Sequence, residues 1–93
     1  MKVSELKDKG SVDELTLKIT EKQEPRALRG GSLHVCNLTG EDDSGSVIIA
    51  LWNEDIDKVK VGNKIKIKEG WSRIFNDQMQ VSTGRNGILE VLE

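Results

Sequence analysis

Aliphatic and polar residues alternate along much of this chain, which is the pattern of β-strands with one buried face. Residues 15–20 alternate leucine and isoleucine with threonine and lysine, and residues 64–68 alternate lysine with isoleucine. Residues 47–52 are apolar throughout, with Val47, Ile49 and Leu51 on one face. Residues 33–38 form another apolar run, although both of its faces are mixed, and a last strand starts at Gln78. The pattern therefore predicts five strands.

The segments between these strands carry the residues that favour turns and short helices. Residues 4–9 can form a short helical turn, and residues 26–32 are typical of a mobile loop closed by two glycines. Residues 40–45 predict a turn, residues 54–59 a short helix, and Asn76–Asp77 a tight two-residue hairpin loop. The predicted helix falls between the third and fourth strands.

Short strands joined by glycine-rich turns indicate a barrel or a sandwich. Five strands with a helix between the third and the fourth match the OB-fold, a small Greek-key barrel. We therefore expect an all-β, five-stranded OB-fold barrel. An SH3-like barrel is the main alternative on the pattern alone.

A bulge is predicted in the fourth strand, where strict alternation would fail. Ile65 and Ile67 must face the core, so continued alternation would also turn Glu69 and Arg73 inward. Burying these charges without partners in so small a core would be costly. A bulge at Glu69–Gly70 adds one residue and reverses the face of everything that follows.

Beyond this bulge the aromatic and cationic side chains point away from the core. Trp71, Arg73 and Phe75 face outward, while Ser72 and Ile74 face inward. Two of the three aromatic residues of the chain therefore lie within five positions on one exposed face. An alternative is that both rings are core residues and that the arginine extends past them to solvent.

The hairpin register supports the exposed arrangement. With Asn76–Asp77 as the loop, the outward pairs are Phe75 with Gln78, Arg73 with Gln80, and Trp71 with Ser82. Two rings, a guanidinium group, two amides and a hydroxyl make a poor core. They suit the stacking of splayed nucleic-acid bases, with an arginine available for a phosphate.

The charge of the chain is divided unevenly. The formal net charge is −2, but residues 1–57 hold seven Lys/Arg and twelve Asp/Glu, whereas residues 58–85 hold seven and two. The local balances are therefore −5 and +5, and residues 86–93 add −2. An anionic ligand responds to the local field, so the net charge does not exclude a nucleic acid.

Three more arginines are candidates for phosphate contacts. Arg26 and Arg29 flank the glycine-rich loop at the edge where OB-folds bind ligands, although ordinary solvated charges would look the same. Arg85 lies between two glycines and is a candidate for a backbone contact. The lysine stripe at positions 64, 66 and 68 is either a solvated strand face or a continuation of the platform.

No pattern in the sequence predicts catalysis, a cofactor or a metal site. The acidic run at 41–43 lacks EF-hand spacing, and Cys36 with His34 cannot complete a four-ligand zinc site. We expect Cys36 to be a small buried apolar residue, and the single cysteine fits a reducing cell interior. No apolar run approaches membrane-spanning length, and no signal peptide is recognisable.

Four stretches in order resemble archaeal single-stranded DNA-binding OB domains related to replication protein A. They are Val47-Ile-Ile-Ala-Leu-Trp52, Val61-Gly-Asn-Lys-Ile-Lys-Ile67, Trp71-Ser-Arg-Ile-Phe75 and Gln78-Met-Gln-Val81. The resemblance covers roughly residues 12–92. Each motif is weak alone, and their order and spacing together are fairly specific.

The resemblance implies a role for Trp52 that the pattern leaves open. Trp52 shares its face with Ile48 and Ala50, which also permits a core position. In the family, aromatic residues matching Trp52, Trp71 and Phe75 stack on bases. All three aromatic residues would then contact the ligand, and the core would be wholly aliphatic.

We therefore expect residues 1–93 to form one non-catalytic OB-fold domain that binds single-stranded DNA with little sequence preference. Excision from a longer multi-domain chain is left open. The resemblance implies work in DNA replication, recombination and repair, in the cytoplasm at the nucleoid, with other OB domains or repair proteins as partners. A protein-interaction OB domain and an RNA-binding OB domain are the alternatives.

Overall fold

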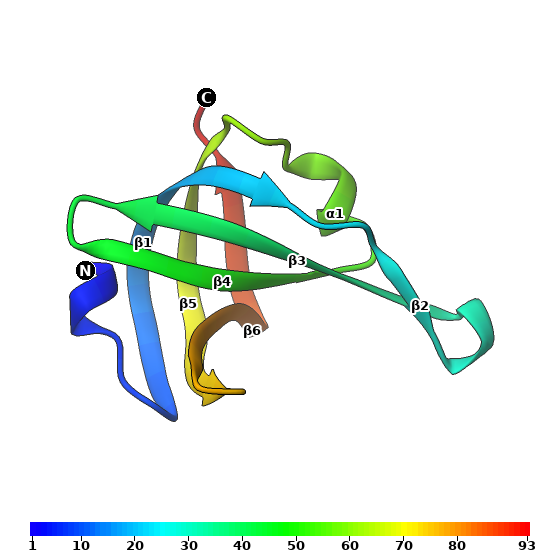
Figure 1. Ribbon diagram of the computed structural model, residues 1–93, viewed down its shortest axis with the longest axis horizontal. Coiled ribbons are helices and arrows are strands. Elements are labelled where there is room, and N and C mark those ends of the chain that lie inside the picture. Colours follow the sequence, from blue (N-terminus) through cyan, green and yellow to red (C-terminus); the bar gives the residue numbers. More distant parts are fainter.

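The computed structural model describes residues 1–83 and 87–93, and Figure 1 shows its strands wrapped into a barrel. The elements in chain order are η1 (Val3–Glu5), β1 (Gly10–Lys22), β2 (Arg26–Leu28), η2 (Arg29–Gly31), β3 (Leu33–Asp42), β4 (Gly45–Trp52), α1 (Asp55–Lys58), β5 (Lys64–Phe75) and β6 (Gln78–Val91).

The strands form one sheet that closes on itself. The order is β1-β5-β6-β4-β3-β2, and β1 also pairs with β3, so that β1, β5, β6, β4 and β3 make a closed five-stranded barrel. All pairings are antiparallel except that between β4 and β6. The helix α1 lies between β4 and β5, which are the third and fourth barrel strands. The predicted OB architecture is confirmed.

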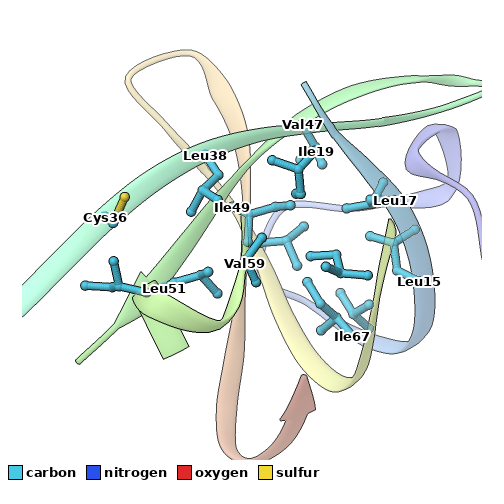
Figure 2. Close-up of a cluster of buried hydrophobic side chains, with 14 of the residues drawn as sticks. Leu15, Leu17, Ile19, Cys36, Leu38, Val47, Ile49, Leu51, Val59 and Ile67 are labelled. Atoms are coloured by element: carbon cyan, nitrogen blue, oxygen red, sulfur yellow. The ribbon is translucent and has the colours of Figure 1, made fainter. Parts of the chain in front are cut away.

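The barrel core is aliphatic, as expected. The strand faces that alternate in the sequence meet inside the barrel, where Figure 2 shows leucine, isoleucine and valine side chains from β1, β3, β4 and β5 around one centre. The buried cluster contains Cys36 but no aromatic residue. A core filled without rings leaves every aromatic side chain of the chain available for the surface.

Two predicted segments differ from the structure. The helical turn expected at 4–9 is only the short η1, because Leu6 turns into the core and the chain then enters β1 at Gly10. The loop expected at 26–32 contains β2 and η2, because Arg26–Leu28 pairs with the start of β3. In Figure 1 this part of the chain projects from the barrel as an arm, which we call the β2 arm.

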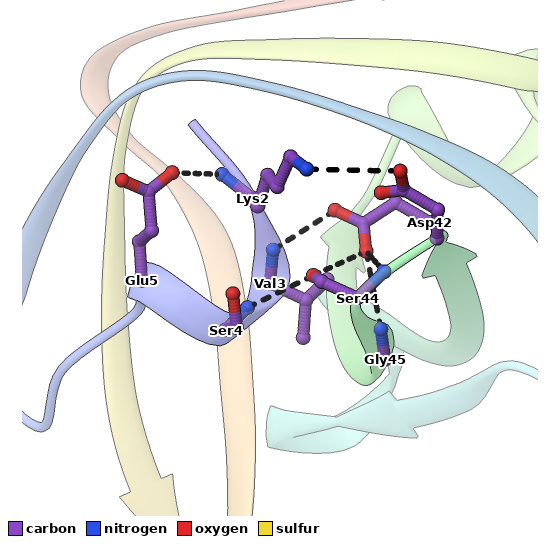
Figure 3. A network of polar contacts seen from close by, with 8 residues as sticks. Lys2, Val3, Ser4, Glu5, Asp42, Ser44 and Gly45 are labelled. Atoms are coloured by element: carbon purple, nitrogen blue, oxygen red, sulfur yellow. Dashed lines mark hydrogen bonds and ion pairs between the residues drawn. The ribbon is translucent and has the colours of Figure 1, made fainter.

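The N-terminal segment is fastened to the β3–β4 turn through Asp42 (Figure 3). The Asp42 carboxylate accepts hydrogen bonds from the Val3 N–H at 2.9 Å, from the Ser44 N–H and hydroxyl at 2.7 and 2.6 Å, and from the Gly45 N–H at 3.2 Å. Partial burial opposes the negative charge, but the bonds from Ser44, Val3 and Gly45 outweigh it and hold the pKa of Asp42 below its usual value.

Candidate nucleic-acid interface

The predicted bulge in β5 is present and sets the direction of the side chains that follow it. The pairing of β5 with β6 shifts between Lys68 and Gly70, and Glu69 has a φ of 53°. Gly70 is required there, because a Cβ atom would lie 2.9 Å from the Ser82 carbonyl oxygen. Before the bulge the isoleucines are buried and the lysines face outward. After it Ser72 is buried, and Trp71 faces outward.

The hairpin between β5 and β6 has the predicted register. Phe75 pairs with Gln78, Arg73 with Gln80, and Trp71 with Ser82. Asn76 and Asp77 both have positive φ, at 51° and 62°, which is the conformation of a type I′ turn.

The expectation that Ile74 points into the core is wrong. Ile74 pairs with Met79 on the face of Ser72, as predicted, but it is 52% exposed. The reason is that β1 pairs with β5 only as far as Ser72, so the barrel wall ends before Ile74.

A groove of about 770 Å³ runs over the outer face of the hairpin, across β4 and β3, to the β2 arm. Fifteen side chains line it, and seven of the nine predicted site residues are among them. Those seven are Arg26, Trp52, Trp71, Arg73, Phe75, Gln78 and Gln80. The fold therefore gathers into one surface residues that are up to 54 positions apart in the sequence.

The strand register places these residues in rows across the sheet. Trp71, Ser82, Ala50 and Asn37 form one row, and Arg73, Gln80 and Ile48 belong to the next. Successive rows are about 6.6 Å apart, since a strand rises about 3.3 Å per residue. Phe75 and Gln78 occupy the row beyond.

Trp52 lies at the other end of the groove. It is two residues beyond Ala50 on β4 and pairs with Val35, which in turn pairs with Arg26 of the β2 arm. Its ring is therefore two strands across from that of Trp71, at about 4.8 Å per strand, and one row along. The core position that the pattern allowed is wrong, because the core face of β4 carries Val47, Ile49 and Leu51.

The three aromatic rings are all partly open to solvent. The exposed fractions are 38% for Trp52, 44% for Trp71 and 51% for Phe75. Exposed large aromatic residues that gather in one groove, above a core without aromatic residues, are typical of a ligand-binding surface.

Arg73 is held between two groove residues. Its guanidinium carbon lies 5.0 Å from the centre of the Phe75 ring, within cation–π range, and its Nε–H donates to the Gln80 Oε1 at 3.4 Å. The Arg73 side chain, with its positive charge, therefore lines the part of the groove over the β5–β6 hairpin.

The groove has a positive lining. Arg26 and Arg73 are the charged residues among its described lining residues, and no carboxylate is included. The lysine stripe does not extend this surface, because Lys66 lies 3.1 Å from Glu14 and Lys68 lies 3.5 Å from Glu90 in ion pairs on the other side of the bulge.

Two predicted site residues are not part of the described groove. Arg29 lies at the end of the β2 arm with a φ of 51° and does not line the groove. Arg85 falls outside the residues that the structure describes.

The structure also adds groove residues that were not among the predicted site residues, although Ser82 was already predicted on the face of Trp71. They are Gln23, Leu28, Val35, Asn37, Ile48, Ala50, Asn76 and Ser82. Ile48 and Ala50 could have been found, because they share the face of Trp52. Asn37 could not, because neither face of its strand is clearly apolar, so its register was undefined.

Two findings concern the groups that the sequence analysis weighed as metal ligands or catalytic residues. No group of three His, Cys, Asp or Glu side chains is placed to hold a metal ion there. Cys36 is buried, as predicted, and its thiol donates to the Gln23 carbonyl oxygen at 3.0 Å. Burial raises the pKa of the Cys36 thiol, against a weaker opposing effect of Lys22. No helix in the described residues is long and apolar enough to cross a membrane.

The barrel and its groove define a ligand-binding OB-fold domain. Residues 9–91 match the family described as "Single-stranded DNA binding protein Ssb-like, OB fold", and the chain belongs to this family. A relative is the single-stranded DNA binding protein Ssb of Saccharolobus solfataricus, which is 27% identical over 85 residues. That match covers 89% of this chain and 57% of the relative, so the chain spans just over half of the relative's length.

Solved structures with the same fold include two archaeal proteins. The replication factor A related protein of Methanobacterium thermoautotrophicum superimposes with a TM-score of 0.82 at 23% identity, covering 100% of this chain and 90% of that one. The second OB-fold domain of replication protein A from Methanococcus maripaludis gives a TM-score of 0.74 at 23% identity, covering 100% and 94%. At this identity they show the fold, and the predicted resemblance is confirmed.

Proposed function

We propose that this protein binds single-stranded DNA in the groove with little sequence preference and without catalysing a reaction. The observation that carries the proposal is the gathering of Trp52, Trp71 and Phe75 with Arg73 in one open groove, whose described lining includes no carboxylate. Family membership supports it, since the family's description and the Saccharolobus relative's name both specify single-stranded DNA.

In this proposal the groove residues divide the work by chemistry. The rings of Trp52, Trp71 and Phe75 stack on bases, and each base has a π-face, so stacking tolerates any sequence. Arg73 and Arg26 neutralise phosphates inside the groove. The amides of Gln78 and Gln80 bond base edges or sugars.

Two further arginines extend the contact beyond the described groove. Arg29 can meet a phosphate at the end of the β2 arm, and Arg85 remains a backbone-contact candidate from the sequence alone. The biological role we propose is DNA replication, recombination and repair, alongside other OB domains or repair proteins. Additional linked domains would raise a modest affinity through effective concentration.

Tryptophan fluorescence during titration with oligo-dT tests the proposal. Both tryptophans are proposed stackers and the chain has no tyrosine, so base stacking should quench most of the signal. The variants Trp52→Phe and Trp71→Phe assign the quenching to each ring. No quenching at high micromolar oligo-dT would contradict the proposal.

The salt dependence provides a second criterion. Each phosphate neutralised on a single strand contributes about −0.7 to the slope of log affinity against log salt. The two groove arginines alone therefore contribute about −1.4 to the slope, and contacts from Arg29 and Arg85 would bring it to about −2.8. Substitution of Arg26 or Arg73 should make the slope shallower by about 0.7. Equal binding of oligo-rU would instead favour an RNA-binding or unselective domain, since distinguishing RNA from DNA requires contact with the 2′-hydroxyl.

A further inference from the structure

The turn that precedes β1 holds the strand that carries the stacking residues. The buried Ser72 hydroxyl donates to the Lys7 carbonyl oxygen at 2.7 Å and lies 3.3 Å from that of Gly10. The Ile74 N–H donates to the Asp8 Oδ1 at 2.9 Å. Residues 7–10 thus contact β5 at two positions, through the side chain of Ser72 and through the backbone N–H of Ile74.

Asp8 satisfies a β5 backbone group where the neighbouring strand stops. β1 pairs with β5 no further than the Gly10–Ser72 pair, so the β1-facing edge of β5 is open beyond this point. The Asp8 carboxylate takes the place of a missing strand carbonyl at Ile74. Without it this N–H would depend on water.

The two anchored residues alternate with the residues that face the groove. Ser72 lies between Trp71 and Arg73, and Ile74 lies between Arg73 and Phe75. Because side chains of adjacent strand residues point to opposite faces, holding Ser72 and Ile74 fixes the direction of the three groove residues. The contact that holds Ile74 lies at the β1-facing edge of β5 and not in the groove.

We propose that Asp8 is a positioning residue for the binding groove, which acts through the Ile74 N–H rather than by touching the ligand. This inference rests on the proposed function. Its hydrogen bond keeps the end of the hairpin ordered before DNA arrives, so less freedom is lost on binding. In this role the Asp8 carboxylate would strengthen the binding of a polyanion, whereas its negative charge by itself would weaken that binding.

Because the hydrogen bond and the charge of Asp8 should change the affinity in opposite directions, two variants can separate them. Asp8→Ala removes both the charge and the acceptor, whereas Asp8→Asn removes the charge but keeps an oxygen that can accept from Ile74. Loss of charge alone should leave binding of a polyanion unchanged or improve it. Asp13→Ala, at an exposed position on β1, is the control for charge.

We expect Asp8→Ala to bind oligo-dT about fivefold more weakly than the wild type, the effect of one net hydrogen bond. Asp8→Asn and Asp13→Ala should bind at least as tightly as the wild type. Hydrogen exchange of the Ile74 amide, measured by NMR without DNA, should be faster in Asp8→Ala and close to wild type in Asp8→Asn.

The outcomes separate this inference from the proposed function. If the wild type binds and Asp8→Ala binds as tightly as Asp8→Asn, Asp8 does not position the groove. Unchanged hydrogen exchange of the Ile74 amide in Asp8→Ala would also overturn the inference, whether or not the protein binds DNA. Failure of the wild type to bind would overturn the proposed function and, with it, the role of Asp8 in binding.

Discussion

At the scale of single residues, the position of Trp71 separates binding from stability. Its ring is partly exposed in the groove, while the aliphatic core below is complete without it. Removing the ring should therefore affect a ligand more than the fold. The same reasoning applies to Phe75, whose ring also contacts Arg73.

Trp71→Ala should weaken oligo-dT binding by about 5- to 150-fold, which corresponds to the roughly 1–3 kcal/mol of one base stack. The free energy of unfolding should fall by less than about 1 kcal/mol, because the side chain is not in the core. Titration of the remaining tryptophan and urea denaturation measure the two effects.

Ile74→Ala is the matched control for this variant. It removes an exposed apolar side chain from the same strand, but from the face that does not line the groove. Its affinity should stay within about twofold of the wild type, a change smaller than 0.5 kcal/mol. A loss as large as that of Trp71→Ala would mean that the strand, rather than the ring, determines binding.

At the scale of elements, the β5–β6 hairpin carries strain in its turn. Asp77 has a φ of 62°, a region that costs most residues with a Cβ atom about 1–2 kcal/mol and that aspartate adopts more readily than they do, but less readily than glycine. Asn-Gly is the preferred pair for this type of turn. The natural Asn76–Asp77 loop is therefore usable but not optimal.

Asp77→Gly should raise the free energy of unfolding by roughly 0.5–1 kcal/mol, after the entropy cost of glycine is subtracted. Thermal denaturation should show a melting temperature a few degrees higher. Asp77→Ala removes the same charge but keeps the Cβ atom, so it should give no comparable gain. Equal stabilisation by both variants would show that charge, and not backbone conformation, limits this turn.

The same hairpin shows how far sequence could predict the site. The bulge, the register and the outward direction of Trp71 and Phe75 follow from a local rule, because an unpaired glutamate or arginine does not enter a small core. The exposure of Ile74 did not follow from this local rule. It depends on where β1 stops pairing with β5, which is decided more than 60 residues away.

At the scale of the whole molecule, the N-terminal segment joins distant parts of the barrel. Asp42 fastens it to the β3–β4 turn (Figure 3), and residues 7–10 fasten it to β5. The stability of the barrel should therefore depend on the charge of Asp42.

Asp42→Ala should lower the free energy of unfolding at pH 7 by about 1 kcal/mol, similar to the loss of a helix N-cap. The folded state holds the pKa of Asp42 below its usual value of 3.8. Its contribution is therefore complete above about pH 4 and is lost as the pH falls through the folded pKa. Urea denaturation at pH 7 and at successively lower pH should show the two proteins converging.

Asp43→Ala provides the comparison. Asp43 lies 3.7 Å from Lys2 in an exposed ion pair, and such pairs contribute little. It should change stability by less than about 0.5 kcal/mol at either pH. A pH-independent loss in Asp42→Ala would mean that Asp42 acts through packing and not through its charge.

The sequence by itself determined the five barrel strands and the exposed platform of the β5–β6 hairpin, because alternation and burial cost act between neighbouring residues. Only the tertiary structure decided the rest of the groove. Asn37 and Arg26 join Trp52 through strand pairing, and Asp8 reaches Ile74 across 66 positions. Such contacts depend on the register of separate strands, and register is set only when the whole core packs.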